Sequence, residues 1–536
     1  MEWQTVLIGS GVAAAAVATK LLERDPNHGL LVLEAGPRVP SRDRRLWWDF
    51  VLSGRSAYEH CHDLPLPGNG TAETENESTG PTPWTFRESR MMGVGGSTYH
   101  WGGWSLRFKE EDFELFSRTG RGADWPISYD DLEPFYCQAE TLLGTSGEDP
   151  HGWNRRSRDY PLPPFRHTAA DGPMIQAFEK LGIAYASMPV ARFRKCMTTG
   201  TCKYCPLGAR FVASYLLDDL LTSERHANFA LRDRSAVSEL IFDRKDRVIG
   251  VGVLDTPTGK TESIFAERFV ICAGSYESAK LLLRSRNAYW PNGAGNDAGL
   301  VGRHIISHPF LFVQGRSPAN PRRLQQELDF PTLMSRHFDT PHEQRGGKLF
   351  LFRDRSKPRI DLARRMIEGR SRSQIEAELT GPTVWEIQGF MEEFANPNNR
   401  IELGQGLNRL GLPQTRIHFA RADGFEQTSV ERLRVMQEVI RAMGFAVGES
   451  GVQPQRGDHA ASTCRMAKAP GDGVVDENLR VHGIGNLHVC SNAVFPSGAA
   501  VNPTLTVTAL SLRLGEHLQP ADRADQAVHT RPVALA

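Results

Sequence analysis

The 536-residue sequence has no long apolar run, no excess of charge of either sign and few cysteines. No segment approaches the roughly 20 apolar residues that a membrane-spanning helix needs, so we expect none. Basic and acidic residues both number 63, which argues against nucleic acid or an anionic membrane as the main partner. Eight cysteines in a chain of this length argue against a secreted disulfide scaffold.

The first residues also lack the charged segment that opens a signal peptide, and they lead directly into an apolar strand. We therefore expect the protein in the cytoplasm, or in the periplasm only if a signal-bearing partner exports it. The length predicts two domains with insertions. A content of 40% apolar and 24% charged residues is typical of a globular protein.

A glycine-rich turn near the N-terminus has the spacing of a dinucleotide-binding fingerprint. An apolar strand ends at Gly9-Ser-Gly11-Val-Ala-Ala14, an alanine-rich helix follows, and a second strand ends in Glu34. The two glycines would let the backbone approach a pyrophosphate at the helix N-terminus. Glu34, 20 residues beyond Ala14, would hold the ribose hydroxyls. The alternative is a strand–helix turn that binds no ligand.

Two further segments have turns that suit a flat ligand. Residues 90–103 are rich in glycine, which leaves backbone amides open, and His100 within them is interpreted as a packed, hydrogen-bonded loop histidine. A strand at residues 268–272 runs into a glycine turn and a helix, which repeats the strand–turn–helix pattern. The residues that we expect at the ligand are Gly93, Gly95, Gly96, Ser97, Ala273 and Gly274.

A histidine and an asparagine near the C-terminus form a reasonable alcohol-oxidising pair. His459 lies 43 residues before Asn502, each is in a loop of small residues, and an apolar helix over residues 504–514 follows. The imidazole can take a hydroxyl proton, and the amide can hold the same oxygen. Neither side chain does redox chemistry, so such a pair needs a cofactor.

Three cysteines, Cys196, Cys202 and Cys205, lie within ten residues in a loop of glycine, threonine and proline. They could bind zinc, a three-iron cluster, or a four-iron cluster with one outside ligand. The alternatives are a redox-active Cys202–Cys205 pair and unrelated thiols. His304 and His308 are four residues apart, but Pro309 argues against a helix through both, and we interpret them as structural or as site walls.

The remaining segments predict a second β-sheet and a connecting region that covers the site. Residues 104–190, with a helix start at Ser128, are interpreted as connection and cover without chemistry. Between residues 310 and 455, short strands alternate with polar loops, interrupted by a charged helix and closed by a long amphipathic one. We expect strands over residues 310–314, 348–352, 383–389 and 415–419, and helices over residues 360–379 and 426–443.

In this order, the motifs resemble those of the glucose-methanol-choline (GMC) oxidoreductase family of flavoenzymes over nearly the whole chain. The resemblance implies FAD, with His459 and Asn502 before the isoalloxazine ring. It implies that His459 is the base and that the substrate hydride passes to flavin N5. It also implies that Ser491, Asn492 and Ala493 pack on the pyrophosphate and that Asn502, Pro503 and Thr504 lie beside the ring.

Within the family, the sequence is most similar to pyranose oxidases and to the flavoprotein subunits of bacterial FAD-dependent sugar dehydrogenases. His100 falls where pyranose oxidase carries its flavin-linked histidine, which implies covalent FAD at His100, although the surrounding residues differ. The cysteine loop is similar to the cluster loop of bacterial glucose and fructose dehydrogenases, with different spacing, and this favours an iron–sulfur cluster over zinc.

The resemblance implies an α/β protein, with a Rossmann-like FAD-binding domain and an inserted α+β substrate domain on a mostly antiparallel sheet. The FAD-binding parts are residues 1–110, 191–309 and 456–536, the cover segment is 111–190, and the substrate domain is 310–455. The expected activity is oxidation of a sugar or glycoside hydroxyl to the keto form, with electrons leaving through the cluster to a cytochrome or quinone and a small partner subunit. The alternatives are an oxidase that uses dioxygen, with structural cysteines, and a lyase with structural flavin.

Overall fold

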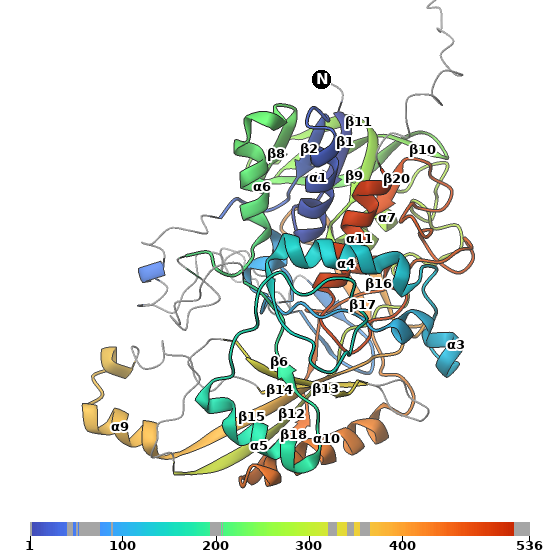
Figure 1. Ribbon diagram of the computed structural model, residues 1–536. Helices are drawn as coiled ribbons and strands as arrows, with labels where there is room; N and C mark the ends of the chain where they lie inside the picture. Colours follow the sequence, from blue (N-terminus) through green and yellow to red (C-terminus); the bar gives the residue numbers. More distant parts are fainter. Residues whose placement is uncertain are drawn as a thin grey trace, which may run out of the picture.

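The computed structural model describes residues 3–39, 47–49, 52, 76–86, 89–192, 205, 207–319, 330–339, 348–353 and 365–518. Two bodies of different build lie one above the other (Figure 1). One contains a seven-stranded, largely parallel sheet with helices against it, and the other a six-stranded antiparallel sheet. This mixed α/β architecture confirms the expected fold class.

The seven-stranded sheet has the order β8-β2-β1-β11-β10-β9, with β20 also paired to β11. Around β1 and the second half of β11 the pairing is parallel, and β10 and β9 continue it as antiparallel strands. Its central strands are almost wholly apolar and buried, as a sheet covered on both faces requires. The strands are β1 (Trp3–Ile8), β2 (Leu30–Leu33), β8 (Phe229–Arg232), β9 (Ser235–Arg244), β10 (Arg247–Asp255), β11 (Thr261–Ile271) and β20 (Leu487–Val489).

Helices of small and apolar residues pack on this sheet and on one another. α1 (Val12–Arg24) lies against α11 (Thr504–His517) and α6 (Ala213–Thr222), and α4 (Tyr129–Leu143) crosses α11 (Figure 1). A side chain at Gly515 would come within 2.7 Å of the Cβ of Lys20, so the first and last helices of the described chain approach closely. This packing places the loop before α11 at the same end as the N-terminus of α1, and both border one cavity.

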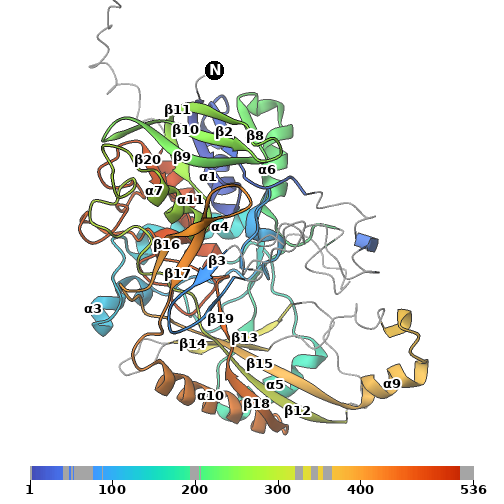
Figure 2. The same ribbon diagram turned by 180° about the vertical axis from the view of Figure 1, so that it is seen from behind.

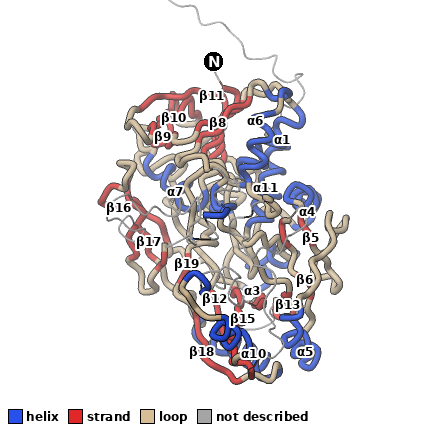
Figure 3. Tube along the Cα trace, turned by 90° about the vertical axis from the view of Figure 1, so that its left-hand side faces the viewer, coloured by secondary structure: helices blue, strands red, loops and turns tan. Residues whose placement is uncertain are grey.

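The six-stranded sheet has the order β18-β12-β15-β14-β13-β6, and all of its pairs are antiparallel. α5 (Gly172–Leu181) and α10 (Phe425–Ala442) pack together at its outer side, remote from the seven-stranded sheet (Figures 2 and 3). Apolar side chains from both helices and four of the strands form this core. The strands are β6 (Ala186–Ser187), β12 (Phe310–Ala319), β13 (Leu333–Phe338), β14 (Leu349–Arg353), β15 (Pro382–Met391) and β18 (Ala446–Val452).

For residues 310–455, one expected strand is present but belongs to another sheet, and one expected helix is shorter than predicted. The strand expected at 415–419, β17 (Pro413–His418), joins β16 (Arg400–Leu407) and β3 (Asn76–Ser78) in a separate sheet between the two larger ones (Figure 2). The helix expected over residues 360–379 is interrupted at Gly369, whose φ is +75°, and α9 (Arg372–Thr380) begins only after its N-cap Ser371. The sheet that β17 joins depends on strands distant in sequence. The break in the helix depends on a positive φ, which glycine adopts readily.

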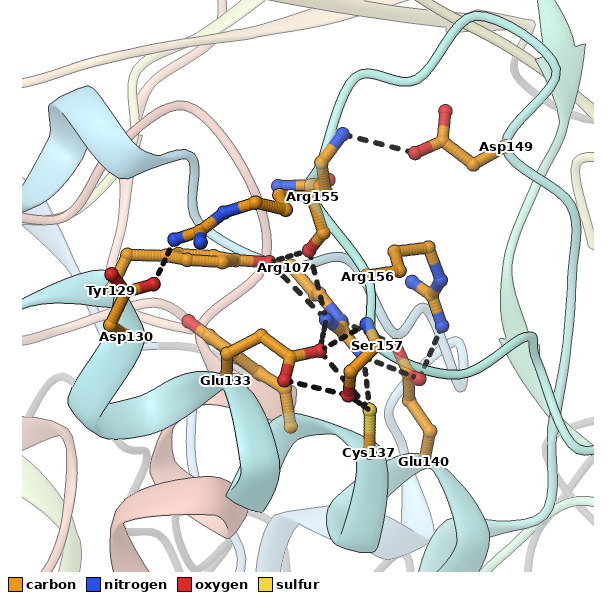
Figure 4. Close-up of polar contacts among 12 residues, drawn as sticks. Arg107, Tyr129, Asp130, Glu133, Cys137, Glu140, Asp149, Arg155, Arg156 and Ser157 are labelled. Carbon is orange, nitrogen blue, oxygen red and sulfur yellow. Dashed lines mark hydrogen bonds and ion pairs between the residues drawn. The ribbon is translucent and has the colours of Figure 1, made fainter.

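The segment interpreted as cover, residues 104–190, carries a buried ionic cluster (Figure 4). The fully buried Arg107 donates from Nε and Nη2 to the two carboxylate oxygens of Glu140, at 2.9 and 3.0 Å. Its Nη1 donates to Glu133 at 3.0 Å and to Tyr129 at 3.2 Å. We call these four residues the Arg107 cluster. Since both acids lie on α4, the cluster fixes that helix to the strand-like segment before it.

Within the described part of the chain, no helix is long and apolar enough to cross a lipid bilayer. The same ranges contain no group of three or more histidine, cysteine or acidic side chains arranged to hold a metal ion.

Candidate active site

A cavity of about 630 Å³ collects most of the residues that the sequence places at a ligand. Its walls come from the seven-stranded body and from strands of the antiparallel sheet. The predicted residues that line it are Gly9, Gly11, Glu34, Gly96, Ser97, His100, Ala273, Gly274, His459, Ser491, Asn492, Asn502, Pro503 and Thr504. Four others do not line it and lie behind the wall, namely Ala14, Gly93, Gly95 and Ala493.

The turn between β1 and α1 leaves a backbone surface that is open to the cavity. Gly9 has a φ of +101°, and a Cβ there would come within 2.7 Å of the carbonyl oxygen of Cys272. Gly11 is the N-cap of α1 without a side-chain hydrogen bond, and no atom lies within 4 Å of where its Cβ would be. The positive end of the α1 dipole therefore faces open space, which suits a pyrophosphate.

Glu34 lines the cavity beside the turn between β1 and α1. Its carboxylate accepts hydrogen bonds from the backbone N and Oγ of Ser10, at 3.1 and 2.6 Å, and from the backbone N of Gly36, at 2.9 Å. Burial raises the pKa of Glu34. Three donors hold the group in place, and a carboxylate oxygen can accept more than one hydrogen bond, so it suits a ribose hydroxyl. Ser10 was not assigned a role from the sequence, and its place between the two glycines was the only signal.

The glycine-rich segment at residues 93–103 lies on the N-terminus of α1. A Cβ at Gly96 would be 3.1 Å from the Cα of Gly11, so the two glycines allow the two loops to touch. His100 follows the short 3₁₀ helix η2 (Gly96–Tyr99) and borders the cavity. Its covalent bond to a flavin stays a prediction.

His459 owes its position to pairing between two distant loops. Ile306 and Ala461 exchange backbone hydrogen bonds, of 2.9 and 3.3 Å, as an antiparallel bridge. In this antiparallel register, the residue two after Ile306 lies opposite the residue two before Ala461. His308 is therefore beside His459, with 2.9 Å between their Nδ1 atoms. His308 was left between a structural and a site-wall role by the sequence, and the structure makes it a direct neighbour of His459.

The hydrogen bonds around these rings fix the tautomer of each. His308 Nε2 contacts the backbone carbonyls of Gly498 and Ala499 at 3.1 and 3.0 Å, and carbonyl oxygens only accept, so Nε2 carries the hydrogen. Burial lowers the pKa of His308 to about 4, so near neutral pH its Nδ1 has a lone pair. The hydrogen between the rings must then be on Nδ1 of His459, which leaves the lone pair of His459 on Nε2.

The second ring nitrogen of His459, Nε2, faces Asn502. The Nδ2 of Asn502 donates to it at 3.1 Å, which agrees with the tautomer that His308 imposes. The Oδ1 of Asn502 is buried and has no partner among the described residues. A buried polar atom without a partner is costly in a protein interior, which is typical of a group arranged for a ligand.

Aromatic rings surround the pair on the side of the antiparallel sheet. Phe390 stacks on His308, with centroids 5.9 Å apart and an interplanar angle of 9°, and meets His459 edge-on at 5.3 Å. Burial, the neighbouring His308 and the charge of Arg456 together lower the pKa of His459 well below its ordinary value. The ring is therefore a neutral base near neutral pH, with part of its surface open to the cavity.

The predicted metal ligands are only partly within the described ranges. Cys196 and Cys202 lie outside them. Cys205 is a half-buried free thiol that accepts a hydrogen bond from the backbone N of Ala209 at 3.4 Å. The cluster therefore stays a prediction from the sequence.

Comparison with known proteins places these features in a family. The chain matches family models described as GMC oxidoreductase over residues 77–310 and 395–511, together about two thirds of its length. It is 26% identical to the fructose dehydrogenase large subunit of Gluconobacter japonicus, over 95% of this chain and 96% of that protein. It is 28% identical to the 6'''-hydroxyparomomycin C oxidase of Streptomyces lividus, over 98% of this chain and 93% of that protein.

Solved structures share the fold at low sequence identity. Pyridoxine 4-oxidase from Mesorbium loti aligns with a TM-score of 0.63 and 18% identity, over 96% of this chain and 99% of that one. Formate oxidase from Aspergillus oryzae aligns with a TM-score of 0.67 and 15% identity, over 96% and 97%. At such identities the likeness shows the fold alone.

Proposed function

Since the chain belongs to the GMC oxidoreductase family, we propose that it is an FAD-dependent enzyme that oxidises a hydroxyl group of a sugar or glycoside to a carbonyl. The observation that carries this proposal is the neutral His459, which presents its Nε2 lone pair beside the Asn502 amide in the same cavity as the dinucleotide cradle.

The cavity fits FAD at the end where Gly9, Gly11 and Glu34 meet. The turn before α1 offers backbone amides for a pyrophosphate, and Glu34 offers a carboxylate for a ribose. Asn492, Pro503 and Thr504 line the part of the cavity toward His459. FAD, when bound, would accept the two electrons of a carbon–hydrogen bond as a hydride. Covalent attachment at His100 belongs to the same proposal, and colour that stays with acid-precipitated protein would test it.

The acid–base work falls to two side chains. The lone pair on Nε2 of His459 takes the proton of the substrate hydroxyl while the carbon loses hydride, which leaves a carbonyl and an imidazolium. Nδ1 of His459 already donates to His308, so the imidazolium keeps a hydrogen-bond acceptor on its far side. Asn502 Nδ2 donates to the same substrate oxygen and holds it in position.

The substrate class is supported by the relatives and by the wall of the cavity. One relative is named a fructose dehydrogenase subunit and another an oxidase of a hydroxylated aminoglycoside. Trp104, Phe352 and Phe390 form one aromatic face, with Trp104 and Phe352 centroids 4.6 Å apart. Such rings pack against the C–H faces of sugars and exclude water from the reacting bond.

An anaerobic screen tests this proposal. The FAD-containing protein is mixed under argon with a panel of sugars, glycosides and simple alcohols, and the loss of flavin absorbance is followed. We expect bleaching by one or more carbohydrates and a carbonyl product in equal amount. Bleaching by simple alcohols alone would reject the substrate class, and no bleaching by any compound would reject the oxidation.

We further propose that electrons leave through an iron–sulfur cluster held by Cys196, Cys202 and Cys205 to a cytochrome or quinone, with a small partner subunit. The support is the three-cysteine loop in the sequence and a relative that is itself named a large subunit. Iron and labile sulfide in protein purified without oxygen would support it. Flavin without iron, combined with rapid reoxidation by dioxygen, would instead identify an oxidase.

A further inference from the structure

Arg192 is a buried cation that borders the cavity and has no counter-ion among the residues that the structure describes. Its residue is 2% exposed, it follows β7 (Val190–Ala191), and it lines the cavity together with Trp104, Phe352 and His459. No ion pair joins its guanidinium to a carboxylate in the described ranges. A buried charge without a partner is unfavourable by itself, so such a group indicates a missing anion.

The nitrogens without partners lie on one edge of the guanidinium. Nε and Nη2 of Arg192 are both buried and make no hydrogen bond. Their N–H bonds point to the same side of the planar group, so together they form a two-pronged donor that matches the two oxygens of a carboxylate. The group stacks on Phe330, with its central carbon 3.8 Å from the ring centroid, which holds the plane of the fork.

The chain itself shows which ligand this edge takes when a partner is present. In the Arg107 cluster, Nε and Nη2 of another buried arginine bind the two oxygens of Glu140 at 2.9 and 3.0 Å. Arg192 is buried like Arg107 and has the same Nε and Nη2 edge, but no acid of the described residues pairs with it. The neighbouring Arg210, which pairs with Arg192 in a backbone bridge, donates instead to the carbonyls of Tyr99 and Trp101.

We propose that Arg192 binds a carboxylate of the substrate, so that the preferred substrates are sugar acids or glycosides that bear one. The hydroxyl groups of a neutral sugar can fill the two hydrogen bonds but leave the buried charge without compensation, whereas a carboxylate supplies both. Arg192 and His459 border one cavity, so one molecule with a carboxylate and a hydroxyl can meet both. This inference rests on the proposed function, because it names the class of molecule that the same site oxidises.

A binding measurement tests this inference independently of the oxidation. In FAD-containing protein carrying His459→Ala to block turnover, calorimetry compares the uronates of glucose, galactose and mannose with their uronamides, which have the same size without the charge. We expect at least one uronate to bind about 10- to 100-fold more tightly than its amide, the range for a hydrogen-bonded charge. Adding Arg192→Met should abolish this preference, and Arg192→Lys, which keeps the charge without the fork, should retain part of it.

Turnover gives a second readout in protein with His459 intact. Under argon, Arg192→Met should raise the uronate concentration that half-saturates flavin reduction by about 10- to 100-fold, with little change for the uronamide or in the limiting rate. The inference is overturned if no uronate binds better than its amide, if Arg192→Met keeps the preference, or if that variant loses FAD. Bleaching without a charge preference would reject this inference and leave the proposed function standing, and a charge preference without bleaching would do the reverse.

Discussion

The Arg107 cluster and the cavity around His459 are both buried and polar, but they differ in whether their polar atoms have partners. Every guanidinium nitrogen of Arg107 is hydrogen-bonded, and the acids on α4 balance its charge. In the cavity, Asn502 Oδ1 and two nitrogens of Arg192 have no partner among the described residues. A satisfied cluster stabilises the fold, whereas unsatisfied atoms in a cavity are arranged for a ligand.

The two regions should therefore respond in opposite ways to substitution. Removing a group from the cluster should lower stability and leave the chemistry intact once the protein is folded. Removing a group from the cavity should slow the chemistry and leave stability nearly unchanged, because no protein partner loses a charge. The largest expected effect comes from the base.

His459→Ala should slow substrate-driven flavin reduction by about 10²- to 10⁴-fold, because the hydroxyl proton loses its acceptor. FAD content and the denaturation midpoint should remain near those of the wild type. Stopped-flow absorbance under argon measures the rate. The matched control is His304→Asn, a buried histidine that does not line the cavity and whose φ of +66° asparagine tolerates. A wild-type rate in His459→Ala would show that another group is the base.

Arg107→Met should lower the free energy of unfolding by about 3–5 kcal/mol, since Glu133 stays buried without its cation and Glu140 keeps only Arg156. Chemical denaturation followed by fluorescence measures the loss. The rate of flavin reduction per bound FAD should not change, which makes this variant the converse of His459→Ala. Adding Glu133→Gln to Arg107→Met should recover part of the lost stability, because Glu140 still pairs with Arg156 and Glu133 no longer carries an unpaired charge. A slow but stable Arg107→Met protein would contradict the division between the two regions.

His308→Gln should slow flavin reduction by about tenfold, the equivalent of one hydrogen bond. Glutamine can still donate to the Gly498 and Ala499 carbonyls but has no acceptor where Nδ1 of His308 lies, so His459 is no longer held in one tautomer. His308→Asn places an oxygen near the position of Nδ1 and should restore most of the rate. Nitrogen-15 spectra of His459 give a readout that packing alone would not change. A single, unaltered tautomer in His308→Gln would show that His308 does not position the base.

The smallest expected effect is the response of the rate to mild acid. Burial and the neighbouring positive groups lower the pKa of His459, so flavin reduction should fall less than about twofold between pH 7 and 5.5. A histidine with an ordinary pKa near 6.5 would lose about eightfold of its neutral form over the same range. The reduction rate at saturating substrate, measured across this range, gives the answer. A fall beginning at pH 6.5 would mean that the ring is not desolvated.

Two buried histidines, His304 and His308, make the stability of the protein depend on pH in a defined direction. In the unfolded chain they bind protons near pH 6.5, whereas burial lowers the pKa of folded His304 and His308 to about 4. The unfolded state therefore binds more protons between these values, and stability, fully present above pH 6.5, is lost as the pH falls toward 4. Replacing His308 should flatten part of this dependence.

The sequence alone predicted the features that depend on contiguous residues. The turn at Gly9 and Gly11, the acid at Glu34 and the helix after Asn502 each require a local pattern of small, apolar and acidic residues, and the structure has them where expected. The strand–turn–helix units indicated parallel strands, which need such crossovers, and the resemblance to the GMC family implied the full fold class. The pairing of His459 with Asn502 was also proposed from the residues, and the resemblance to the GMC family added the flavin in front of it.

Only the tertiary structure decided which distant residues serve the base and the cavity. His308 meets His459 because Ile306 pairs with Ala461, and a shift of one residue in that register would turn its side chain away. Arg192 is unusual only because no acid in the described part of the chain reaches its buried fork, and a sequence cannot show where a counter-ion is absent. Both facts depend on how remote segments pack, whereas a local motif is set by the conformations that its own few residues can adopt.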